Sequence, residues 1–85
     1  MENANEISFG EWLKRQRKAA GWTQEQLARQ VNCSTITLRK VEAGERRPSE
    51  QMAARLAEIF HVAPEERESF LRFARRGLGE APALA

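Results

Sequence analysis

The chain has 85 residues, enough for a single domain with one small hydrophobic core. Hydrophobic residues make up 41% and charged residues 31%, as in an ordinary globular protein, but so small a core leaves little depth for a catalytic cleft. No apolar run approaches the roughly 18 residues of a membrane span, and the single cysteine and single histidine make neither a disulfide nor a metal cage. We therefore expect a soluble, cytoplasmic protein that is not an enzyme and needs no metal or cofactor.

The charge is distributed unevenly along the sequence. The net charge is only +2, yet residues 12–47 carry nine Lys or Arg against three Glu, and the segments on either side are acidic. A basic centre between acidic flanks is typical of a protein that binds a polyanion such as nucleic acid. On charge alone, a solvated surface that binds nothing is an equal alternative.

The first two predicted helices each begin at a hydroxyl side chain. Residues 9–20 follow Ser8, which can act as the N-cap, and Gly21 ends this helix. Residues 23–31 begin with Thr23, which is placed to form a capping box with the glutamine three residues later. Both segments have the apolar spacing of amphipathic helices.

Three further helices complete an all-α, five-helix bundle. Asn32 can take the left-handed conformation of a tight turn, and Ser34 caps a third helix that ends near residue 43. The fourth and fifth helices are predicted over residues 49–60 and 64–76.

The last residues differ from the rest of the chain. The predicted domain covers residues 1–77, and residues 78–85 have no periodicity, so we expect them to be a disordered tail or a linker to a further domain.

The second and third helices form a predicted helix-turn-helix over residues 23–43. A turn of three residues joins them, and their apolar positions can face each other: Leu27, Ala28, Val31, Leu38 and Val41. If Leu38 and Val41 face inward, four side chains of the third helix face outward: Thr35, Ile36, Arg39 and Lys40. Side chains of these types can contact base edges in a DNA major groove, which makes residues 35–43 the candidate recognition helix.

The run GWTQEQLARQVNCSTITLRKVEAGERRPS, residues 21–49, resembles the phage-repressor-like helix-turn-helix family, the Xre and Cro type with a lambda-repressor-like fold. The resemblance covers residues 9 to about 64, with the matching positions at the family's spacing and no gap. It implies a DNA-binding transcriptional regulator of bacterial or phage origin, acting at the nucleoid. Because one such module covers little DNA, a pseudo-palindromic operator is expected, which a homodimer would bind.

The resemblance also implies roles for individual residues. Thr35, Ile36, Arg39 and Lys40 align with base-contacting positions. Phosphate contacts are implied for five residues at helix starts and in the loop after the third helix: Thr23, Gln24, Ser34, Arg46 and Arg47. Arg17 and Glu42 match a pair that family members bury as a salt bridge.

Two questions stay open at this stage. The basic cluster of Lys14, Arg15 and Lys18 can contact flanking phosphate or can be the solvated face of the first helix. The chain can also be a protein-interaction module that keeps the fold without binding DNA, for which Phe70, Phe73 and the long fifth helix are the supporting features.

Overall fold

A computed structural model describes residues 6–84 of the chain. Residues 1–5, with which the predicted domain begins, and Ala85 of the predicted tail lie outside the described residues. Five α-helices dominate the structure: α1 (Phe9–Ala19), α2 (Gln24–Val31), α3 (Thr35–Glu42), α4 (Glu50–Ile59) and α5 (Arg67–Arg76). The prediction of an all-α bundle that contains a helix-turn-helix is confirmed.

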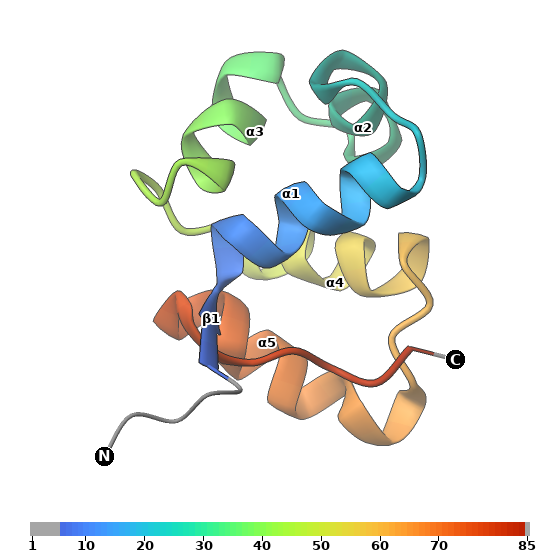
Figure 1. The fold of residues 1–85 in the computed structure, drawn as a ribbon, viewed down its shortest axis with the longest axis vertical. Coiled ribbons are helices and arrows are strands. Elements are labelled where there is room, and N and C mark those ends of the chain that lie inside the picture. The colour runs from blue at the N-terminus through green and yellow to red at the C-terminus, as the bar shows by residue number, and fades with distance from the viewer. Residues whose placement is uncertain (1–5, 85) are drawn as a thin grey trace.

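The helices are arranged around α1 (Figure 1). Helices α2 and α3 lie together at one end of the molecule, α1 crosses the middle, and α5 lies at the opposite end. Helix α1 contacts α3, α2 contacts both α3 and α4, and α4 contacts α5, so one core connects all five. The helix-turn-helix is therefore supported by α1 and α4.

An aromatic cluster joins α1 to α5. The ring centroid of Trp12 lies 5.2 Å from that of Phe70 and 6.1 Å from that of Phe73. The ring of Phe9 also packs against those of both phenylalanines. All four side chains are buried in the hydrophobic core. Phe70 and Phe73 are thus unavailable to a partner, and the idea that they supported a protein-interaction module is wrong.

The segment after α5 is ordered over residues 78–84, contrary to the prediction of disorder, whereas a linker to a further domain stays a prediction. Strand β2 (Leu78–Glu80) pairs in antiparallel fashion with β1 (Glu6–Ser8), and Val62 bridges Leu84 farther along. The pairing partners are about 70 residues apart in sequence, and a strand of three residues has no periodicity to detect. Figure 1 shows this segment running across the front of α5, in the half of the molecule opposite α2 and α3.

The predicted fifth helix is divided into two parts. A short 3₁₀ turn, η1 (Pro64–Glu66), precedes α5, which ends at Gly77 in the left-handed conformation with a φ of 81°. Pro64 stands at the first position of the turn, where the missing N–H costs no hydrogen bond.

Candidate DNA interface

Local hydrogen bonds define where α2 begins and how the chain turns from α2 into α3. The Thr23 hydroxyl accepts from the backbone N–H of Gln26 at 3.1 Å, and the Gln26 side chain accepts from Thr23 N–H at 2.8 Å, which completes the predicted capping box. Asn32 has a φ of 60°, and the N–H of Cys33 closes the turn on the Ala28 carbonyl at 2.9 Å. Local hydrogen bonds thus set the entry into α3.

Helix α3 is divided into a buried and an exposed side. Leu38 and Val41 are fully buried against the core, as their spacing of three residues along a helix requires. Four side chains on the opposite side form what we call the α3 outer face: Thr35, Ile36, Arg39 and Lys40. Thr35 is half-buried and the other three are exposed. The outer face therefore combines two cations, a hydroxyl and an aliphatic side chain on a helix whose inner side is fixed.

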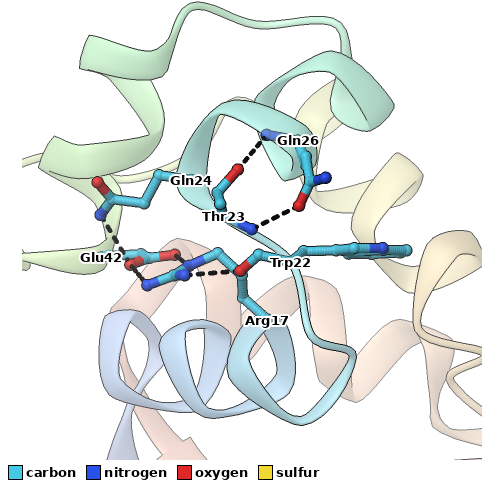
Figure 2. Close-up of polar contacts among 6 residues, drawn as sticks. All are labelled: Arg17, Trp22, Thr23, Gln24, Gln26 and Glu42. Atoms are coloured by element: carbon cyan, nitrogen blue, oxygen red, sulfur yellow. Dashed lines mark hydrogen bonds and ion pairs between the residues drawn. The ribbon is translucent and has the colours of Figure 1, made fainter.

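A buried polar network ties α3 to α1 and α2 (Figure 2). Arg17 binds Glu42 in bidentate fashion, with Nε donating to Oε2 at 2.7 Å and Nη2 to Oε1 at 3.2 Å. Arg17 Nη1 donates to the Trp22 carbonyl at 2.9 Å, and Gln24 Nε2 donates to Glu42 Oε1 at 3.0 Å. The pair that the family resemblance implies is thus present, with side chains only 10% and 4% exposed.

Gly10 is a structural position that the sequence did not reveal. A Cβ atom on this buried residue would lie 2.6 Å from the Val41 carbonyl oxygen and closer still to that of Glu42. Only glycine permits this approach of α1 to the end of α3, because both obstructing atoms belong to the backbone. No local signal reports the contact, since it joins residues more than thirty positions apart.

A basic hollow of about 270 Å³ opens beside the start of α3. Its polar lining includes residues at the starts of α3 and α4 and three arginines: Ser34, Thr37, Ser49, Arg46, Arg47 and Arg55. Two helix N-termini and three guanidinium groups give this hollow a positive potential. Sequence reasoning missed Thr37, Ser49 and Arg55, although an N-cap serine next to a basic loop was a usable signal.

The hydroxyl and guanidinium groups around the basic hollow are not equally free. Ser34 Oγ accepts from Thr37 N–H at 3.0 Å and donates to Thr37 Oγ1 at 2.9 Å, so its proton is already used within the cap. Arg55 Nη1 donates to the Val31 carbonyl at 3.1 Å, at the end of α2. The guanidinium of Arg47 lies against Gly77, where it would clash with any Cβ atom.

A second hollow, of about 150 Å³, lies between α1, α2 and α3. Lys14, Gln24 and Arg39 line it together with Glu42 and Ala43. Lys14 is thus the member of the basic α1 cluster that stands next to the α3 outer face. The Arg15 side chain instead pairs with Glu11 at 3.5 Å on the surface of α1.

Other kinds of site have little support among residues 6–84. No group of three or more His, Cys, Asp or Glu side chains in this part of the chain could hold a metal ion. No helix of the described residues is long and apolar enough to cross a membrane. Burial raises the pKa of the Cys33 thiol, which disfavours the reactive thiolate.

The fold and the exposed α3 define a DNA-binding helix-turn-helix domain. A profile of the helix-turn-helix domain family matches residues 8–70, about three quarters of the chain, and the chain belongs to this family. The match covers α1 to α4 and extends to Phe70 in the aromatic cluster on α5. Neither a curated protein nor a solved structure matches the sequence.

Proposed function

We propose that this domain binds double-stranded DNA in a sequence-specific manner and acts as a transcriptional regulator in the cytoplasm. The observation that carries the proposal is the α3 outer face. Its side chains are of types that can contact base edges, and buried contacts anchor the helix that carries them. A recognition helix must project its side chains into the major groove while its other side stays fixed to the domain. Thr35, Ile36, Arg39 and Lys40 are the residues that we assign to base edges.

The phosphate contacts are assigned to the groups around α3. Arg46 and Arg47 would bind one strand from the basic hollow, and the Thr23 hydroxyl stands at the start of α2. Ser34 stands at the start of α3, where its hydroxyl proton is bonded to Thr37, so we assign its phosphate contact to the backbone N–H groups of that helix start. Gln24 can reach phosphate only with the part of its amide not bonded to Glu42, so its first task is to position α2 against α3. Thr37 joins the set because its hydroxyl accepts from Ser34 and keeps its own proton to donate.

One such module offers a small interface, so an additional element is required for useful affinity. A single domain buries on the order of 600 to 1,000 Å² of protein surface on DNA, whereas specific complexes usually bury more. A homodimer on a pseudo-palindromic operator, with half-sites about one helical turn apart, supplies the rest. Enriched sites that carry two inverted copies would support this arrangement.

Selection from a random double-stranded DNA pool with the full chain tests the proposal. We expect the selection to enrich a short consensus sequence. The Arg39→Ala variant should then lose about 1–3 kcal/mol of binding free energy through the contact to one base pair of that sequence. By contrast, Arg46→Gln should weaken all sequences alike and lower the salt slope by about 0.9 for each phosphate that the arginine neutralises.

Arg72→Gln serves as the matched control for both variants, because Arg72 is an exposed arginine on α5 that lines a hollow only with residues of α5 and β2. Its DNA affinity and salt slope should equal those of the unmodified chain. A selection that enriches no consensus would contradict specific binding. Equal losses for Arg72→Gln and Arg46→Gln would mean that only net charge matters.

A further inference from the structure

Ile36 is the most exposed of the large hydrophobic side chains in residues 6–84. It is 61% exposed, against 52% for Leu78 and 46% for Leu84, which both lie in the segment after α5. A single exposed aliphatic side chain is common on protein surfaces and needs no explanation by itself. The position of Ile36 does need an explanation, because Ile36 is the second residue of α3 and belongs to the α3 outer face.

The neighbours of Ile36 on this face are polar. Arg39 and Lys40 follow it by three and four residues, so they share its side of the helix, and Thr35 precedes it. The amphipathic pattern of α3 would be satisfied by any polar residue at this position. An aliphatic side chain among cations and hydroxyls is complementary to a partner surface that is mostly polar but carries one apolar group.

The major groove of DNA presents one such spot. Guanine, adenine and cytosine show hydrogen-bond donors and acceptors there, whereas thymine adds a C5-methyl group. An isoleucine cannot hydrogen-bond, so packing it over donors or acceptors would desolvate them without replacement. Contact with a methyl group removes apolar surface of both partners from water.

We propose that Ile36 selects thymine in the DNA site by packing on its C5-methyl group. The inference rests on the proposed function and assigns one specificity element within it. Arg39 and Lys40 then account for hydrogen-bonded base contacts, and Ile36 for a contact that depends on shape and apolar area alone.

The test uses the full chain and the DNA site enriched from the random pool. Each thymine of one half-site is replaced in turn by uracil, which keeps the pairing with adenine and lacks only the methyl group. Binding is measured by fluorescence anisotropy at one fixed salt concentration. One replacement should weaken binding by about fourfold, the equivalent of one buried methyl-sized group.

The Ile36→Ala variant should bind the thymine site more weakly and bind the thymine and uracil sites equally. Leu78→Ala is the matched control, since it removes a similarly exposed aliphatic side chain from β2 and should keep the fourfold discrimination. Circular dichroism checks that both variants are folded, as expected for side chains that contribute little to the core.

The outcomes separate this inference from the proposed function. If the chain binds a consensus site but no uracil replacement weakens it, or if Ile36→Ala keeps the discrimination, the inference is wrong and sequence-specific binding stands. An enriched half-site without thymine has the same meaning. If there is no salt-dependent DNA binding at all, the proposed function fails and the inference fails with it.

Discussion

Removing either partner of the Arg17–Glu42 pair should destabilise the domain strongly. In Glu42→Gln the Arg17 guanidinium keeps the Trp22 carbonyl but loses its counter-charge, and in Arg17→Met the carboxylate keeps only Gln24. Breaking a buried ion pair by removing one partner costs about 3–5 kcal/mol, because the remaining charge stays buried without compensation. A domain of this size loses about 4–8 °C of Tm per kcal/mol, so each variant should melt more than about 10 °C lower.

Urea unfolding followed by circular dichroism measures this effect as a change in the free energy of unfolding. The matched control is the pair of Arg72 and Glu68 on α5, which is 3.5 Å apart with side chains 53% and 88% exposed. Glu68→Gln should cost no more than about 1.5 kcal/mol, because an exposed pair one helical turn apart contributes about 0.5 kcal/mol and a carboxylate in the first turn of a helix up to about 1 kcal/mol.

A double variant distinguishes a missing charge from a missing shape. Arg17→Met combined with Glu42→Leu leaves no uncompensated charge, so it should be more stable than either single charge-removing variant. Equal costs for the Glu42→Gln and Glu68→Gln variants would refute the reasoning, as would a double variant that is no more stable than either single variant.

Three further results are expected. Gly10→Ala should cost about 1–3 kcal/mol in urea unfolding, because its Cβ atom meets backbone oxygens at the end of α3 that cannot move aside; a cost near zero would show that α1 can shift. Lys14→Gln should lower DNA affinity and the salt slope, whereas Lys18→Gln, on the same helix but outside the hollow that Lys14 lines, should change neither. Thr35→Glu should raise the free energy of unfolding by about 0.3–1 kcal/mol and weaken DNA binding; stronger binding to DNA would contradict the placement of α3.

Local signals predicted much of this fold. The capping box at Thr23, the left-handed turn at Asn32 and the end of α5 at Gly77 each depend on a few neighbouring residues, so the sequence is enough to locate them. The pairing of β1 with β2 and the approach of Gly10 to α3 join distant residues and leave no periodic pattern. Such contacts follow from how the helices pack, and local patterns in a single sequence do not reveal that packing.

The candidate site divides in the same way. Helical phase predicted that Arg39 and Lys40 would be exposed, because the buried positions of α3 determine the opposite side. It did not predict that Arg47 would lie against Gly77, or that Arg55 would join the basic hollow from α4. Those positions depend on where the loop after α3 and the helix that follows it turn back on the domain.

Helix α3 differs from the other α-helices at its first turn, in a way that the proposed function accounts for. The other four α-helices each carry a glutamate there: Glu11, Glu25, Glu50 and Glu68. A carboxylate at a helix N-terminus contributes about 0.3–1 kcal/mol by its interaction with the helix dipole, yet α3 has none. Of the helix starts, that of α3 is the one proposed to enter the groove, where a glutamate would face the phosphates of both strands, and α3 therefore forgoes stability where the proposed function requires a positive surface.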